Sequence, residues 1–126
     1  MEQDLLLERL KKLDTCAVSD ALDAFGIRGV ALNLKPVWPC GRIAGRAVTV
    51  KLGPYSGRPA RRHLGTAAVE AATPDNVIVV EHRGRTDVAG WGGLLSTAAG
   101  HKGIAGTVID GACRDVDESR ERGYPV

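Results

Sequence analysis

The sequence has few aromatic residues and almost no net charge. Only 4% of its 126 residues are Phe, Trp or Tyr, which leaves little material for the aromatic platforms on which unpaired bases stack. The 17 basic and 15 acidic side chains give a formal charge of +2, which is too balanced for the cationic face of a nucleic-acid-binding domain. We therefore expect no nucleic-acid partner.

Long apolar runs and paired cysteines are also missing. No apolar stretch approaches the ~20 residues that a membrane-spanning helix needs, so we expect no membrane association. The three cysteines, Cys16, Cys40 and Cys113, contain no Cys-x-x-Cys pair. The first residues, MEQDLLLERLKKL, are charged throughout and do not resemble a signal peptide. These features predict reduced thiols and a cytoplasmic protein.

Several familiar catalytic motifs are absent. The sequence contains no Gly-x-Gly-x-x-Gly, no P-loop, no Gly-x-Ser-x-Gly and no readable Ser-His-Asp set. The three histidines, His63, His82 and His101, lack the spacing of metal ligands, and we interpret each as a surface or core residue. No lysine is placed to suggest a Schiff base.

The apolar pattern predicts alternating helices and strands in one domain, residues 1–126. Helices are predicted over 3–13, 17–25, 61–72, 92–99 and 115–122, and strands over 42–52, 76–81 and 104–109. Thr15 is the predicted N-cap of the second helix, Gly26 its end, and Gly45 a bulge in the first strand. A further strand is expected to begin at Tyr124. The alternation predicts an α/β fold with a largely parallel sheet, whose sites lie beyond the carboxyl ends of the strands.

Two segments that follow predicted strands carry the residues of chemical interest. Arg114 and Asp115 come just after the third strand, and Glu118 follows Asp115 by three positions. The pair Gly92-Gly93 lies upstream, with twenty residues between Gly93 and Arg114. A fixed cation, two carboxylates and a glycine-rich helix start would suit a small anionic keto acid and a divalent metal.

Each segment also has a purely structural interpretation. Asp115 and Glu118 match a capping box at a helix start, which would explain both carboxylates but not Arg114. The glycine pair could mark a tight turn that needs positive φ. The thiol of Cys113 could have a pKa lowered by Arg114, although we favour a small buried residue at this position. The sequence leaves the structural and the functional interpretation of both segments open.

The stretch GWGGLLSTAAGHKGIAGTVIDGACRDVDESRERGYPV, from Gly90 to Val126, closely resembles the RraA-like family. Upstream, TCAVSDALDAFG, GRIAGRAVTV and ATPDNVIVVE resemble the family's N-terminal pattern and central strand. The resemblance covers residues 15–126, a family core preceded by an N-terminal helix within residues 1–14. Its most specific part is the signature Gly-x20-Arg-Asp-x2-Glu, formed by Gly93, Arg114, Asp115 and Glu118. The family includes 4-hydroxy-4-methyl-2-oxoglutarate/4-carboxy-4-hydroxy-2-oxoadipate aldolases and the regulator of ribonuclease E activity.

This resemblance implies a swivelling β/β/α-type fold that assembles as homotrimers or hexamers with sites between subunits. It implies a divalent metal, Mg²⁺ or Mn²⁺, bound by Asp115 and otherwise largely by water. Arg114 would bind the keto oxygen of a pyruvyl unit. The carboxylate of that unit would be held by main-chain amides in the segment formed by Gly92, Gly93, Leu94 and Leu95.

The position of Gly93 is acidic in some family members, where it helps to organise water on the metal. With glycine here, Glu118 would have to take that part. The activity implied is that of a class II pyruvate aldolase acting on 4-hydroxy-4-methyl-2-oxoglutarate-type substrates, with oxaloacetate decarboxylase activity. The alternative is a non-catalytic regulator that binds a ribonuclease or another protein. Family chains continue beyond Pro125-Val126, so we expect this chain to be C-terminally truncated.

Overall fold

The computed structural model describes residues 4–126, which fall into two compact units on either side of the Lys35–Pro36 bond. The first unit contains α1 (Leu5–Leu10) and α2 (Thr15–Ala24). The prediction that Thr15 caps the second helix was wrong, because the Asp14 carboxylate accepts the amide of Ala17 at 2.7 Å and caps the helix. The cap lies one residue earlier than predicted, and the helix begins at Thr15 instead of Ala17. The predicted end at Gly26 is confirmed, with φ of 65° at this residue.

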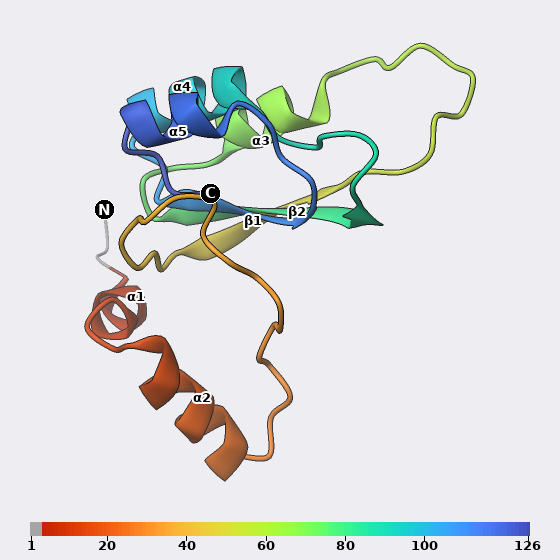
Figure 1. Cartoon of the computed structure of the whole chain (residues 1–126). Coiled ribbons are helices and arrows are strands. Elements are labelled where there is room, and N and C mark those ends of the chain that lie inside the picture. The colour runs from red at the N-terminus through yellow and green to blue at the C-terminus, as the bar shows by residue number, and fades with distance from the viewer. Residues whose placement is uncertain (1–3) are drawn as a thin grey trace. The chain divides into compact units, whose positions relative to one another are not determined.

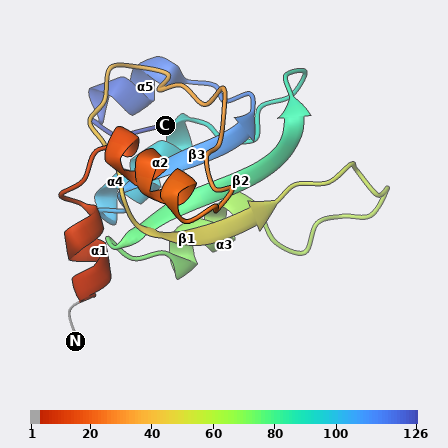
Figure 2. The same cartoon turned by 90° about the horizontal axis from the view of Figure 1, so that it is seen from below.

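The second unit is a three-stranded parallel sheet with all three of its helices on one face (Figure 1). Its elements are β1 (Arg46–Lys51), α3 (Leu64–Ala71), β2 (Asn76–Arg85), α4 (Gly93–His101), β3 (Gly106–Gly111) and α5 (Val116–Glu121). The strands lie in the order β1-β2-β3, seen from below in Figure 2. Right-handed crossovers between strands that advance in one direction place successive helices on the same face. The prediction of an α/β fold with a largely parallel sheet is confirmed.

The core lies between the sheet and these helices. Because side chains alternate along a strand, Ile78 and Val80 of β2 both point toward the helical layer, and they are 0% and 2% exposed. Trp91 and Tyr124 complete the core, with ring centroids 6.4 Å apart.

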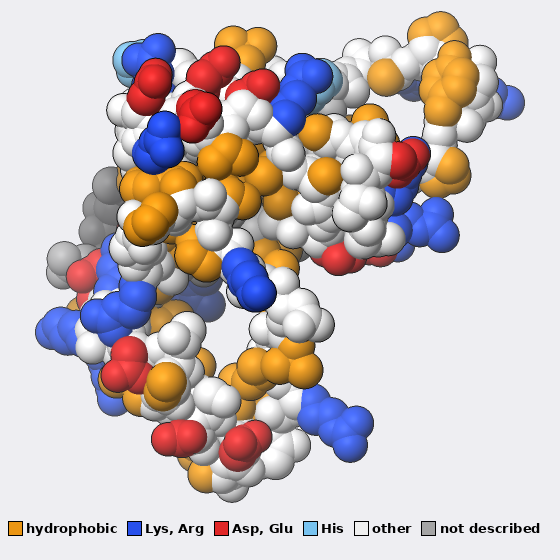
Figure 3. All heavy atoms as spheres, in the orientation of Figure 1, with side chains coloured by type: hydrophobic (Ala, Val, Ile, Leu, Met, Phe, Trp, Pro, Cys, Tyr) orange, Lys and Arg blue, Asp and Glu red, His pale blue; other side chains and the backbone are white. Residues whose placement is uncertain are grey.

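In the face drawn in Figure 3, acidic and basic side chains are interspersed over the surface. No helix within residues 4–126 is long and apolar enough to cross a membrane.

Several predicted boundaries differ from the structure for identifiable reasons. The helix expected from Arg61 begins at Leu64 because the His63 side chain accepts the amide of Thr66 and caps it there. The predicted bulge at Gly45 is not formed, since the β1–β2 register is continuous from Arg46. A Cβ on Gly45 would lie 2.8 Å from the backbone nitrogen of Val77. Glycine at this position therefore permits the segment before β1 to lie close to the start of β2.

The strand expected to begin at Tyr124 is absent from the described residues. Pro125 has no amide hydrogen to donate to a ladder, and only its carbonyl pairs with β3, accepting the amide of Thr107 at 2.9 Å. The strand predicted over 76–81 extends four residues farther than expected, to Arg85, after a register shift beyond Glu81.

Tyr124 gives the fold a dependence on alkaline pH. Its side chain is 2% exposed and its hydroxyl lies 2.8 Å from Thr107 Oγ1. Burial raises the pKa of Tyr124 from 10.0 to about 12, so the folded state holds this proton more tightly than the unfolded chain does. The resulting stabilisation is fully present below pH 10 and is lost as the pH rises toward 12.

We expect Tyr124→Phe to lower the free energy of unfolding at pH 8 by about 1–3 kcal/mol, because Thr107 loses its buried partner. Urea unfolding of both proteins at pH 8 and pH 11 measures this effect. The difference between their free energies of unfolding should be smaller by roughly 1 kcal/mol at pH 11. A difference that is constant across this pH range would contradict the assignment to the phenol.

Candidate functional site

The segments that follow β2 and β3 run side by side beyond the carboxyl edge of the sheet. Trp91 and Cys113 form an isolated parallel bridge, and the amide of Arg114 donates to the carbonyl oxygen of Trp91 at 3.0 Å. One step earlier, the amide of Gly90 donates to Ala112 at 2.9 Å. This pairing brings the glycine pair next to the Arg-Asp pair, although about twenty residues separate them in the sequence.

The glycines are required by close contacts rather than by a turn. Gly92 has an extended backbone with φ of −153°, and neither Gly92 nor Gly93 has positive φ, so the tight-turn interpretation was wrong. A Cβ on Gly92 would lie 3.0 Å from Asp115 Oδ2 and 3.3 Å from Arg114 Nε. On Gly93 it would lie 2.0 Å from Glu118 Oε2. The three charged side chains of the signature therefore occupy the space next to the two glycines.

Asp115 is held toward the glycines and does not cap its own helix. Its Oδ2 accepts the amide of Gly93 at 3.0 Å and lies 3.4 Å from Arg114 Nε. Its backbone is left-handed, with φ of 57° and ψ of 43°, and its side chain makes no capping bond to α5. The capping-box interpretation of Asp115 and Glu118 is therefore wrong. Aspartate tolerates this conformation better than most residues, which otherwise lose roughly 1–2 kcal/mol in it.

The first turn of α4 offers main-chain donors beside these charges. The amide of Gly93 is taken by Asp115, so it is not available to a ligand. The amides of Leu94 and Leu95 belong to the first turn and have no acceptor among the described residues. The positive end of the α4 dipole adds to their attraction for an anion.

These groups line one open cavity of about 310 Å³. Its floor is formed by residues 89–95, which end in the first turn of α4, and Arg114 and Asp115 form one wall. The Arg114 side chain is 76% exposed and Asp115 is 38% exposed, so both are open to solvent. Thr66 and His63, at the start of α3, also line the cavity. Glu118 is not a lining residue, but its carboxylate lies against Gly93.

A buried polar network begins at Trp91, one of the residues that line the cavity. Trp91 Nε1 donates to Ser96 Oγ at 3.0 Å, and Ser96 Oγ lies 2.8 Å from Ser119 Oγ. All three side chains are at most 2% exposed. The network joins the cavity floor to α4 and α5, so the signature residues rest on a rigid base.

Comparison with known proteins identifies the family of this chain. A family model described as RraA-like, Aldolase/RraA, matches residues 15–126. The chain belongs to the RraA-like family. That family match includes every residue of the cavity.

The chain is similar to proteins that carry different names. The chain is 36% identical over 121 residues to protein DlpA of Legionella pneumophila, covering 96% of this chain and 20% of that protein. It is 29% identical over 120 residues to a Halalkalibacterium halodurans protein named as a candidate 4-hydroxy-4-methyl-2-oxoglutarate aldolase, covering 95% and 54%. The structure of Streptomyces coelicolor RraAS2, described as an unusual member of the RNase ES inhibitor RraA family, matches with a TM-score of 0.84 and 27% identity, covering 98% and 61%. The chain thus spans between a fifth and about three fifths of these relatives.

Two other residues near the RraA-like signature have structural roles. Cys113 is partly buried, and this burial raises the pKa of its thiol, which argues against an activated thiolate. His82 is 5% exposed and its Nε2 lies 2.8 Å from the carbonyl oxygen of Val88, in agreement with its interpretation as a core residue. His63 was also interpreted as a surface or core residue, and the structure places it at the surface, where it lines the cavity.

The cavity suits a hydrated Mg²⁺ or Mn²⁺ ion better than a fully protein-coordinated one. No group of three or more His, Cys, Asp and Glu side chains that could hold a metal occurs within residues 4–126. Asp115 is the one carboxylate among the described residues that line the cavity, and the Glu118 carboxylate lies against Gly93. Mg²⁺ binds through one or two carboxylates and keeps several waters, whereas Zn²⁺ sites use three or four protein ligands.

Proposed function

We propose that this chain carries the pyruvyl-binding site of a divalent-metal-dependent lyase. The proposed reactions are aldol cleavage of 4-hydroxy-4-methyl-2-oxoglutarate-type substrates and decarboxylation of oxaloacetate. The observation that carries the proposal is the shared cavity of Arg114, Asp115 and the free amides of α4. The name of the H. halodurans relative supports the same reaction class.

Substrate binding would use the two kinds of donor in the cavity. The carboxylate of the pyruvyl unit would accept the amides of Leu94 and Leu95 at the positive end of α4. The keto oxygen would accept from the Arg114 guanidinium, whose Nε already lies 3.4 Å from Asp115 Oδ2. This two-point attachment would orient the bond between C3 and C4 of the substrate for cleavage.

Both reactions break that carbon–carbon bond and leave its electron pair on the pyruvyl unit as an enolate. The departing fragment is a 2-keto acid in the aldol cleavage and carbon dioxide in the decarboxylation. Arg114 would stabilise the negative charge that develops on the keto oxygen, and it is effective because it is already in position. Glu118 is our candidate for the group that accepts the hydroxyl proton in the aldol cleavage, directly or through water. The enolate then takes a proton at C3 to give pyruvate.

A divalent metal, Mg²⁺ or Mn²⁺, would be held by Asp115 with Glu118 beside it. It would supply Lewis-acid stabilisation of the same developing charge. We further propose that the protein works in the cytoplasm as a homotrimer or hexamer, as the family resemblance implies.

A second candidate function is regulation of a ribonuclease without catalysis. The similarity to RraAS2 supports it, since that structure belongs to an RNase ES inhibitor family. This candidate assigns no role to the free amides of Leu94 and Leu95 or to the exposed guanidinium beside them.

Pyruvate release from oxaloacetate distinguishes these functions. We expect purified protein with Mg²⁺ to form pyruvate above the rate of a protein-free Mg²⁺ blank, and EDTA to remove the excess. Arg120→Ala is a matched control, because Arg120 lies on α5 and pairs with Asp117, 2.8 Å away. This variant should retain the activity. A rate no higher than the blank, from protein that melts cooperatively, would favour the regulator.

A further inference from the structure

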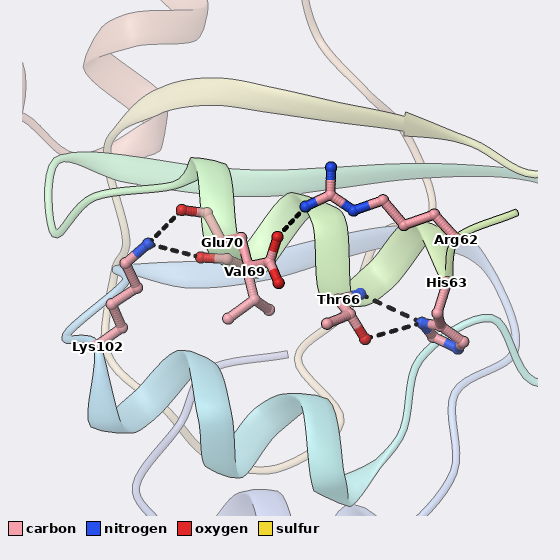
Figure 4. Close-up of polar contacts among 6 residues, drawn as sticks. All are labelled: Arg62, His63, Thr66, Val69, Glu70 and Lys102. Carbon is pink, nitrogen blue, oxygen red and sulfur yellow. Dashed lines mark hydrogen bonds and ion pairs between the residues drawn. The ribbon is translucent and has the colours of Figure 1, made fainter.

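Hydrogen bonds at the start of α3 define the tautomer of the neutral His63 ring. Its Nδ1 lies 3.2 Å from the amide nitrogen of Thr66 and 3.2 Å from Thr66 Oγ1 (Figure 4). A backbone amide can only donate, so Nδ1 must accept and therefore carries no proton. In the neutral ring the proton then lies on Nε2, which has no partner among the described residues. The helix cap thus makes His63 a hydrogen-bond donor through Nε2.

His63, which carries this donor, lines two cavities. His63 lines the cavity that holds Arg114 and Asp115, and it also lines a second cavity of about 270 Å³. The second cavity is mostly apolar and is walled by Val50 and Leu52 of the β1 end, with Val80 of β2. The two cavities share His63, Ala89 and Gly90, and of these three residues His63 alone has a polar side chain.

We propose that His63 is a substrate-binding residue that donates Nε2–H to an oxygen at the end of the substrate remote from the pyruvyl unit. This inference rests on the proposed function and deepens it, because it assigns the binding of the distal carboxylate of those substrates to a named residue. On this proposal the donor contacts the distal carboxylate of a four- or five-carbon keto diacid. Pyruvate has no distal carboxylate and makes no such contact.

The chain offers a variant that separates the two roles of His63. Asparagine is among the best N-cap residues, and its side-chain oxygen can accept the amide of Thr66. His63→Asn therefore keeps the cap and removes the Nε2 donor, whereas His63→Ala removes both. Thermal unfolding should show His63→Asn near wild type and His63→Ala less stable.

Binding is measured by calorimetry with Mg²⁺ present, using pyruvate and 2-oxoglutarate, neither of which is a β-keto acid that the site would decarboxylate. We expect His63→Asn to weaken the binding of 2-oxoglutarate by about tenfold or more and to leave the affinity for pyruvate unchanged. Equal affinities of wild type and His63→Asn for 2-oxoglutarate would overturn the inference and leave the proposed function standing. Equal weakening of both ligands would also overturn it, because His63 would then act on the whole site. If wild type binds neither ligand, the proposed function fails and this inference fails with it.

Discussion

Replacing Arg114 with alanine is expected to lower kcat for oxaloacetate decarboxylation by about 10²–10³-fold, the usual effect of removing one preorganised donor from a developing oxyanion. Because the side chain is 76% exposed and packs little, the free energy of unfolding should change by no more than about 0.5 kcal/mol. The measurements are initial rates of pyruvate formation and urea unfolding of the same preparations.

Arg114→Lys tests whether charge alone is sufficient. Lysine keeps the positive charge but lacks the planar fork of donors, so we expect it to recover only part of the lost rate. Full activity in Arg114→Ala, with normal folding, would remove the residue on which the lyase proposal depends most.

Replacing Asp115 with asparagine is expected to abolish the stimulation by Mg²⁺ and to reduce the remaining activity by at least about 100-fold, since the proposed metal ligand loses its charge. Asparagine is the cleanest substitution here. It tolerates the left-handed backbone at this position, and its side-chain oxygen can still accept the amide of Gly93. A titration of activity against Mg²⁺ concentration measures the effect.

Asp115→Ala serves as the comparison. It removes the acceptor for Gly93 and places alanine in a left-handed conformation, so it should also destabilise the fold by roughly 1–2 kcal/mol. Unchanged Mg²⁺ stimulation in Asp115→Asn would show that the metal is held elsewhere. Equal stability of the two variants would show that the bond to Gly93 contributes little to the fold.

The order of helices and strands could be predicted because it depends on short-range periodicity. Apolar runs such as Asn76–Glu81 read as buried parallel strands, and β2 indeed lies at the centre of the sheet. Helix starts were less predictable, since they are set by individual side-chain bonds. Asp14 and His63 both cap their helices, and in each case the observed helix begins directly after the cap and not at the predicted residue.

The meeting of the glycine pair with Arg114 and Asp115 was also predictable, because parallel strands bring their carboxyl ends to one edge. The bond between Gly93 and Asp115 was not, since it depends on a left-handed backbone that the local sequence does not require. The place of His63 on the cavity was not predictable for a different reason. The loop before α3 has no periodicity, and the signal that the sequence offered was its position after the first strand.

The pairing of Trp91 with Cys113 also explains why the signature has a fixed length. The twenty intervening residues consist of the rest of α4, the connection that follows, β3 and the short step to Cys113. Neighbouring chains in a ladder can slip only by whole residues, each about 3.3 Å long. A deletion or insertion of one residue in this interval must either distort the helix–strand unit or displace the guanidinium by such a step. The length of the chain between Gly93 and Arg114 therefore sets the position of the guanidinium relative to the glycines. We expect a change of even one residue in this length to disturb the site.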